Sequence, residues 1–379
     1  MAGLESYERV YRGKPVSKSW ETENNFPYIY HGQEVIPTLI TETLLVHPLI
    51  VLRRQCQVNP GLSKYHIIPI TLVPVVIRLH QTQGINTLWK GIGSVLLVKG
   101  MLLAIEDFIS KITPWPNSLK AFGICQIISL GLVAPFYSAS LVETVQSEIA
   151  SESPGILDVF RDGAIRLVEV SNKGRLIPIY SLLPPTIAYG VSKYLFTLAV
   201  QGVTSRIMHI RQKQSQELRV KTVAQDIELQ SSLVSTFLAE ALFYPWETVI
   251  HRLHLQGTRT IIDNLDTGRS VTPLLTGYSG ASDCYSTIIS TEGPLGLYKG
   301  FGALIIEFTV NVIIVRVIKW AFTELRTVLR PKPKSREPVN TLDEYSFRNL
   351  NFSPILSNAL SKLMISLSLF LYLSLSLSL

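Results

Sequence analysis

The sequence predicts an all-α membrane protein. Three observations support this fold class: an apolar composition, six long apolar segments and an internal repeat. Of the 379 residues, 47% are hydrophobic and 17% are charged, which is more apolar than an ordinary soluble domain. The apolar segments are centred on residues 36–52, 92–109, 121–145, 176–202, 233–250 and 301–328. Each is long enough to cross a bilayer as a helix, so we expect six transmembrane helices.

The segments form three pairs, and each pair is joined by a polar connector. The first segment of each pair contains a proline, and each connector contains a glycine: Pro48, Pro135 and Pro245, then Gly84, Gly174 and Gly293. Both series recur at intervals of about one hundred residues, as expected for a unit of two helices and a connector. The chain thus divides into a polar N-terminal segment (1–35), repeat one (36–120), repeat two (121–204), a polar connector (205–232), repeat three (233–330) and a low-complexity tail (331–379).

The composition also limits the classes of binding partner that the protein could have. The formal net charge of +7 suits either nucleic acid or an anionic lipid surface. Because no run of basic residues is interleaved with aromatic ones, we expect membrane phospholipids, and not nucleic acid, as partners. The three cysteines, Cys56, Cys125 and Cys284, are too few and too scattered for a disulfide framework or a zinc site.

The first 35 residues do not read as a cleaved targeting sequence. They contain several glutamates, namely Glu5, Glu8, Glu21, Glu23 and Glu34, which an arginine-rich presequence would avoid. They also lack the apolar core of a signal peptide. Any organellar targeting signal is therefore expected inside the chain.

The connectors of repeats one and three share a motif. Residues 278–300, YSGASDCYSTIISTEGPLGLYKG, contain Glu292 and Gly293 and end in Tyr298, Lys299 and Gly300. Residues 83–91, QGINTLWKG, end in the same way with Trp89, Lys90 and Gly91. Two interpretations are open: interfacial anchors with a snorkelling lysine, or a lipid-facing site for a phospholipid phosphate at the start of the following helix.

Together, these motifs resemble the mitochondrial carrier family, solute carrier family 25, over residues 36 to about 330. The resemblance is strongest in repeat three. Three stretches, HPLIVLRRQCQVN, PFYSASLVETVQSEI and HRLHLQGTRTIIDN, are similar to a degenerate branch of that family in the mitochondrial outer membrane.

The resemblance implies a multi-pass bundle of three carrier repeats with pseudo-threefold symmetry in the mitochondrial outer membrane. It also implies a role in the balance of mitochondrial fission and fusion, in cristae and in lipid homeostasis. The implied partners are membrane phospholipids, the fusion and fission machinery and the cristae-organising complex. Ordinary solute exchange is not implied.

In working carriers, the acid two residues after each proline pairs with the base five residues after the proline of a neighbouring repeat. Here the acid positions are Ile50, Tyr137 and Glu247, and the base positions are Arg53, Ser140 and Ile250. If the pairing of the family holds, Glu247 meets Arg53 in the only surviving bridge, which we interpret as structural. Arg252 is assigned to the same motif.

Carriers usually also have an acid near the opposite end of each even helix, twenty-one residues after the lysine that precedes the helix. Counting from Lys90, Tyr180 and Lys299 finds no acid at these positions. The expected acid positions are occupied by Lys111, Gln201 and Trp320, although a slip of register would recover Glu106, Asp107 or Glu324. Glu307 occupies a place where many carriers have an arginine for anionic substrates, and an acid there would repel them. Alternating access needs two networks that exchange stability, and neither is whole here.

Catalysis and metal binding are not expected. Glu247, His251 and His254 share one helical face that could present metal ligands, but no fourth ligand is placed, so ordinary hydrogen bonds are favoured. The closely spaced glycines of GIGSVLLVKG follow no strand and lack the spacing of a phosphate-binding loop. We therefore expect neither an enzyme, a metal site nor a cofactor.

Two other functions stay open. One is a solute transporter of the mitochondrial inner membrane with unusual gates, and the other is a protein that transfers phospholipid between membranes.

The tail, which ends in SLSLFLYLSLSLSL, has three interpretations: a seventh membrane segment, a β-prone low-complexity strand, or an artefact of translating repetitive sequence. We favour the artefact.

Deleting residues 340–379 should leave membrane insertion and abundance unchanged, because the six-helix bundle does not need the tail to satisfy its backbone hydrogen bonds. Carbonate extraction of mitochondria that express the truncated chain measures insertion. Release of the truncated chain into the soluble fraction would show that the tail is an anchor.

Overall fold

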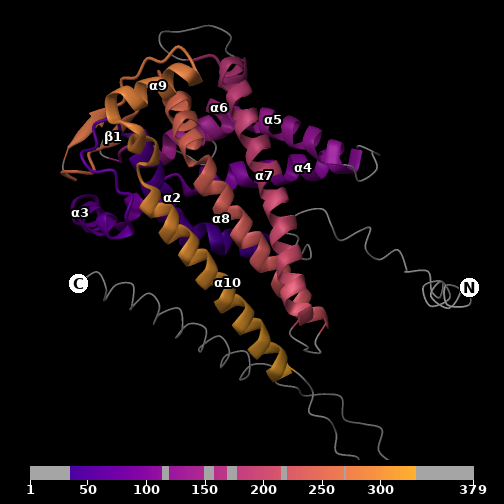
Figure 1. Ribbon diagram of the computed structural model, residues 1–379. Coiled ribbons are helices and arrows are strands. Elements are labelled where there is room, and N and C mark those ends of the chain that lie inside the picture. Colours follow the sequence, from indigo (N-terminus) through magenta and orange to yellow (C-terminus); the bar gives the residue numbers. More distant parts are fainter. Residues whose placement is uncertain are drawn as a thin grey trace, which may run out of the picture. The chain divides into compact units, whose positions relative to one another are not determined.

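The computed structural model describes residues 35–112, 119–148, 158–168, 177–214, 220–268 and 270–329 (Figure 1). The chain forms two compact units: unit 1 comprises Met1–Thr41 and Leu195–Ala239, and unit 2 comprises Glu42–Tyr194 and Glu240–Leu379. The connectors of repeats one and three and the charged positions predicted from the prolines belong to unit 2, whereas the polar connector 205–232 belongs to unit 1. Gly174 and the tail lie outside the described residues.

Within the described residues, six helices correspond to the six apolar segments. They are α2 (Val35–Val58), α4 (Ile92–Ile112), α5 (Leu119–Val145), α7 (Ile179–Gln214), α8 (Val220–Leu255) and α10 (Phe301–Leu329). The repeated prolines lie inside α2, α5 and α8. Residues 205–232, expected as a polar connector, are largely helical, since α7 extends into them and α8 begins in them. Lysine, glutamine and glutamate there are good helix formers that hydropathy does not detect.

Two stretches among the described residues pass a test of length and apolarity for a membrane span: Gly123–Val145 in α5 and Pro294–Val317, which leads into α10. The interior of α2 carries Arg53 and Arg54, and α8 carries Glu240 and Glu247. Charged residues of this kind lower the mean hydropathy of α2 and α8.

The connectors of repeats one and three have the same backbone. In repeat one, η1 (Pro69–Leu72) and α3 (Val73–Gln83) precede η2 (Ile85–Trp89); in repeat three, α9 (Ala281–Glu292) precedes η3 (Pro294–Tyr298). Gly84 and Gly293 end α3 and α9 at φ values of 84° and 77°. A positive φ is strained for other residues, so the recurrence of glycine follows from the turn geometry.

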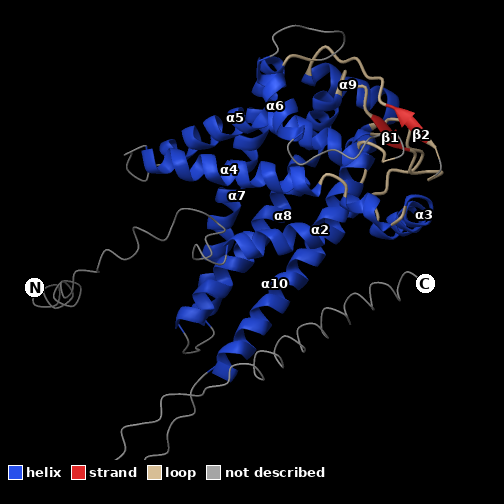
Figure 2. Ribbon diagram, turned by 180° about the vertical axis from the view of Figure 1, so that it is seen from behind, coloured by secondary structure: helices blue, strands red, loops and turns tan. Residues whose placement is uncertain are grey.

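The prediction of an all-α fold is wrong in one place. Strands β1 (Ile261–Asp263) and β2 (Val271–Pro273) follow α8 and pair antiparallel, with Ile262 opposite Thr272 (Figure 2). Each strand has three residues, which is too short for an alternating pattern to stand out. The β-branched side chains are the local signal for strands here.

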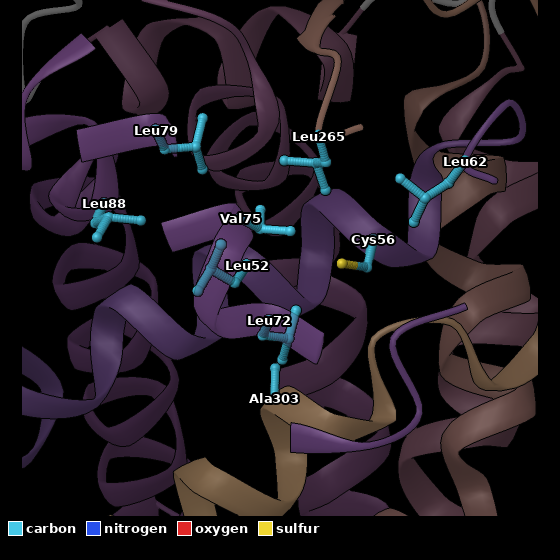
Figure 3. Packing of buried hydrophobic residues seen from close by; sticks show 9 residues of the cluster. All are labelled: Leu52, Cys56, Leu62, Leu72, Val75, Leu79, Leu88, Leu265 and Ala303. Carbon is cyan, nitrogen blue, oxygen red and sulfur yellow. The ribbon is translucent and has the colours of Figure 1, made fainter. Parts of the chain in front are cut away.

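Unit 2 has several apolar clusters that join elements distant in sequence. Helices α4 and α5 run side by side in both views (Figures 1 and 2), with Val98 packing near Val133 and Phe136. Helix α6 (Asp158–Val168) adds Phe160, whose ring centroid lies 5.2 Å from that of Phe136. Figure 3 shows the largest cluster: Leu52, Cys56, Leu62, Leu72, Val75, Leu79, Leu88, Leu265 and Ala303.

The glycine of each Lys-Gly pair allows a close approach between helices. Gly91 and Gly300 have φ values of 67° and 80°. A Cβ on Gly91 would lie 2.9 Å from Thr144 Cγ2 in α5, and one on Gly300 would lie 2.7 Å from Cys56 Cβ in α2. The even helices therefore begin against the ends of odd helices from other repeats, and only glycine fits there.

Replacing Gly300 with alanine should destabilise the protein by about 1–3 kcal/mol because of its strained φ alone, with the Cys56 contact adding to the loss. Gly100→Ala in α4 is the control, since a Cβ there meets nothing within 4 Å. Thermal unfolding in detergent measures both variants. Equal melting temperatures for the two variants would contradict the packing role of Gly300.

Candidate functional site

Arg53 of α2 lies at the centre of a buried group of charged side chains. Its Nη1 is 3.1 Å from Glu240 Oε2 and 3.3 Å from Glu307 Oε2, and its Nη2 is 3.4 Å from Glu247 Oε1. Glu240 and Glu247 come from α8, and Glu307 comes from α10. A second base, Lys193 of α7, places its Nζ 3.5 Å from Glu240 Oε1. We call these five residues the Arg53 cluster.

The Arg53 cluster contains the predicted contact between Arg53 and Glu247, the one bridge expected from the proline motif, and adds Glu240, Glu307 and Lys193 to it. Counting from the prolines could not reveal Glu240 or Glu307 as partners, because neither is an acid position of the proline motif. The available signal was an acid within an apolar helix, which usually has a partner or a function. Glu307 was expected to repel anions, yet its charge is opposed by the Arg53 guanidinium at 3.3 Å.

The other motif positions have exchanged charges for neutral contacts. The Tyr137 hydroxyl lies 2.6 Å from His251 Nε2, and Ser140 Oγ lies 3.1 Å from Ser94 Oγ. Ile50 packs in an apolar cluster with α10 through Ile314. These contacts are buried and carry no net charge, so no second or third bridge forms at these positions.

The face with Glu247, His251 and His254 makes hydrogen bonds. His251 Nδ1 lies 2.7 Å from Gln57 Oε1, and the nitrogens of His254 contact the hydroxyls of Ser138 and Thr186. His251 Nε2 is 3.9 Å from Glu247 Oε1. Among the described residues, no group of three His, Cys, Asp or Glu side chains could hold a metal ion. The imidazole nitrogens of His251 and His254 are therefore hydrogen-bonded to hydroxyl and amide groups.

The connector lysines are buried in protein. Lys90 Nζ lies 3.0 Å from Asp263 Oδ2 and donates to the carbonyl of Gln146 at 2.8 Å. Lys299 Nζ lies 2.6 Å from Glu292 Oε2 and donates to the carbonyls of Asn59 and Pro60. The lysines are 8% and 1% exposed. Burial lowers the pKa of Lys90, and the facing carboxylate of Asp263 counters that shift.

These contacts correct the lipid-facing interpretation of the connector motif. Lys90 satisfies carbonyls at the end of α5, and Lys299 satisfies carbonyls just beyond α2, where helix ends leave acceptors unpaired. Both ammonium groups are directed at carbonyls and carboxylates of the protein. The aromatic partners also contact protein: Trp89 Nε1 donates to Leu44 O, and Tyr298 stacks on Tyr244.

Arg252 of α8 contacts the connector of repeat three and is not part of the Arg53 cluster. Its guanidinium contacts both carboxylate oxygens of Glu292, and its Nε donates to the carbonyl of Gln57 at 2.9 Å. Glu292 thereby bridges Arg252 and Lys299. The sequence assigned Arg252 to the Glu247 motif by proximity, but Arg252 lies five residues after Glu247 and so points to a different side of α8.

The positions expected to form the opposite network show one local pair. Lys111 Nζ lies 2.7 Å from Asp107 Oδ2 within α4, and both side chains are well exposed. Glu106 is buried. Gln201 belongs to unit 1, and the side chains of Trp320 and Glu324 lie outside the described residues.

Comparison with known proteins agrees with these features. Residues 227–328 match the family model described as mitochondrial carrier protein, the class that the prolines and connectors predicted. Proteins named mitochondrial outer membrane protein SLC25A46 are 41% identical in Gallus gallus, 39% in Homo sapiens and 38% in Danio rerio. Each alignment covers 76% of this chain, and it covers 75%, 73% and 77% of the relatives in that order.

The chain therefore belongs to the mitochondrial carrier family, within its SLC25A46 group. The predicted resemblance is confirmed. The names of the relatives also confirm the predicted location in the mitochondrial outer membrane.

The Arg53 cluster predicts an asymmetry between two alanine variants. Arg53→Ala leaves three buried carboxylates without their common partner and should cost at least the roughly 3–5 kcal/mol of a broken buried pair. Glu247→Ala should cost less, because Glu240 and Glu307 still oppose Arg53. Abundance in mitochondria and melting temperature in detergent measure the difference.

Lys111→Ala is the matched control, since its pair with Asp107 is exposed and contributes little. A larger loss for Glu247→Ala than for Arg53→Ala would show that Arg53 is not the centre of the cluster.

Proposed function

We propose that the chain forms a six-helix carrier bundle in the outer membrane that organises mitochondrial membrane dynamics and does not exchange solutes. The Arg53 cluster carries this proposal. One arginine is held by carboxylates of α8 and α10, while the remaining acid and base positions of the motif are Ile50, Tyr137, Ser140 and Ile250.

The six-helix arrangement is supported by helix length and by the repeats. The shortest of the six helices, α4, has 21 residues, which corresponds to about 32 Å and matches the hydrocarbon core of a bilayer. The prolines in α2, α5 and α8 and the matched connectors support three two-helix repeats around a pseudo-threefold axis.

The energetics of alternating access argue against exchange. A carrier lets substrate binding offset the opening of one network while the other forms, and inverting a 1:99 equilibrium requires about 5.5 kcal/mol of differential binding. Here, two of the three bridges at one end are replaced by apolar contacts and neutral hydrogen bonds. The remaining ion pairs join α2 to α8 and α10, and we interpret them as a fixed structural connection between these helices.

The proposed role in fission and fusion balance, cristae and lipid homeostasis rests on the resemblance to outer-membrane carriers. The proposed partners are membrane phospholipids, the fusion and fission machinery and the cristae-organising complex. The protein acts without catalysis, as expected from its family. Pro48, Pro135 and Pro245 shape the odd helices, and the connector motif joins the repeats.

A phospholipid-transfer function is the second candidate. The apolar, exposed side chains of α4 and α5, such as Phe108 and Leu132, suit contact with acyl chains. The buried state of Lys90 and Lys299 argues against these lysines as the headgroup site. The names of the relatives argue against a transporter of the inner membrane.

Purified protein in liposomes should show no saturable counter-exchange of nucleotides, phosphate or carboxylic acids, because too little free energy separates two access states. A working exchanger of the same family, reconstituted in parallel, is the positive control. Radiolabelled uptake measures exchange. Substrate-specific exchange that Glu307→Ala abolishes would make this protein a transporter, and lipid transfer without solute exchange would favour the second candidate.

A further inference from the structure

The segment between α8 and α9 is longer than a turn needs to be, and it packs against several other elements. We call residues 258–275, which contain β1 and β2, the hairpin segment; the structure describes it except for residue 269. No connector motif of the sequence includes this segment. Its neighbours are the ends of α2, α5 and α8, where the connectors begin, and we call this region of unit 2 the connector end.

Backbone and side-chain hydrogen bonds join the hairpin segment to repeat two. Gln146, just after α5, forms an antiparallel bridge with Ile262 of β1. The Ser147 N–H donates to the Ile261 carbonyl at 2.8 Å. The strand is thus extended by the chain that leaves α5, and the end of α5 cannot separate from β1 without losing these bonds.

Repeat one holds the hairpin segment from the other side. Gln55 Nε2 of α2 donates to Asp263 Oδ2 at 3.2 Å, and Gln83 Nε2 of α3 donates to Asp263 Oδ1 at 2.9 Å. Just beyond α2, the Ser63 N–H donates to Asp266 Oδ2 at 2.9 Å. Arg78 also donates to the Asp266 carbonyl. These bonds attach both α2 and α3 to the hairpin segment.

Apolar side chains of the hairpin segment fill the space between the odd helices. Ile262 and Leu274 belong to one cluster with residues from the ends of α2, α5 and α8, namely Val58, Leu141, Val145 and Leu255. Leu265, which follows β1, lies among side chains of α2 and α3 (Figure 3). All three hairpin residues are at most 5% exposed. Separation of the odd helices would expose this apolar surface.

A buried ion pair completes the attachment. Asp263 is 1% exposed and lies 3.0 Å from Lys90 Nζ, which also donates to carbonyls at the end of α5. Burial alone would raise the pKa of Asp263, but Lys90 and the hydrogen bonds from Ser147 and Gln83 lower it overall. Moving Asp263 away would leave Lys90 buried without a counter-charge, which is strongly unfavourable.

We propose that the hairpin segment is a lock that holds the ends of α2, α5 and α8 together and keeps the connector end closed. The proposal deepens the proposed function and rests on its six-helix bundle, because a bundle with one locked end does not open alternately to two sides. The lock acts through elements of all three repeats at once, whereas each motif bridge would join only two. Its removal should loosen the connector end even if the Arg53 cluster stays intact.

Cys56 reports on the lock, because its side chain is 0% exposed and belongs to the cluster that contains Leu265. The full chain with Cys125→Ala and Cys284→Ala is reconstituted in liposomes, and the reaction of Cys56 with N-ethylmaleimide is followed by mass spectrometry. Asp263→Asn keeps the size of the side chain and removes its charge. The labelling rate of Cys56 should rise at least tenfold in Asp263→Asn. Asp107→Asn, an exposed acid in α4, is the matched control and should leave the rate unchanged.

A cross-link separates loss of the lock from general unfolding. Gln146 and Ile262 face each other across the β-bridge, so cysteines at both places are close enough for a disulfide after oxidation. Gln146→Cys with Ile262→Cys, oxidised in the Asp263→Asn background, should restore the protection of Cys56.

Unchanged labelling in Asp263→Asn, or rapid labelling that persists in the oxidised cross-linked variant, would overturn the lock. Loss of Cys56 protection in the parent protein, without solute exchange, would overturn the lock alone, whereas solute exchange by the parent protein would defeat the proposed function and the closed connector end with it, because exchange requires both ends to open. The two failures are therefore distinguishable.

Discussion

The guanidinium of Arg53 keeps its charge at physiological pH, so its burial in unit 2 has to be balanced by carboxylates. Glu240, Glu247 and Glu307 supply that balance from α8 and α10, and Lys193 of α7 opposes Glu240 in turn. The positions of α2, α7, α8 and α10 within unit 2 are thereby coupled. A ring of separate pairs would allow the helices to move apart individually, whereas a shared arginine connects them as one group.

Buried backbone groups in the connectors also need partners, as the buried charge of Arg53 does. A helix end leaves carbonyl groups without intrahelical donors, and a buried end needs donors from elsewhere. Lys90 supplies them to the end of α5, and Lys299 supplies them beyond α2. Each lysine is neutralised by a neighbouring acid, Asp263 or Glu292. A motif that resembles a membrane anchor in the sequence therefore serves to attach one repeat to another.

The hairpin segment of repeat three attaches that repeat to the other two. The hairpin segment brings Asp263 to Lys90 and places Ile262, Leu265 and Leu274 among the ends of the odd helices. The neutral pair of Tyr137 and His251 adds a fixed contact between α5 and α8. This end of unit 2 therefore combines buried ion pairs with apolar packing and neutral hydrogen bonds.

By itself, the sequence determined the helical class, the repeated prolines, the turn glycines and the carrier family, because periodicity, hydropathy and φ requirements are local properties of the chain. It also determined that Ile50, Tyr137, Ser140 and Ile250 have lost the charges of the motif. Only the tertiary structure decided that Arg53 meets three carboxylates, that Arg252 joins Glu292 and that Lys90 faces Asp263. These partners are separated by 40 to 254 residues in sequence, and folding brings them together through packing that no local pattern encodes. The sequence did not predict the two short strands, because their pairing depends on packing against the ends of α2, α5 and α8, which are distant in sequence.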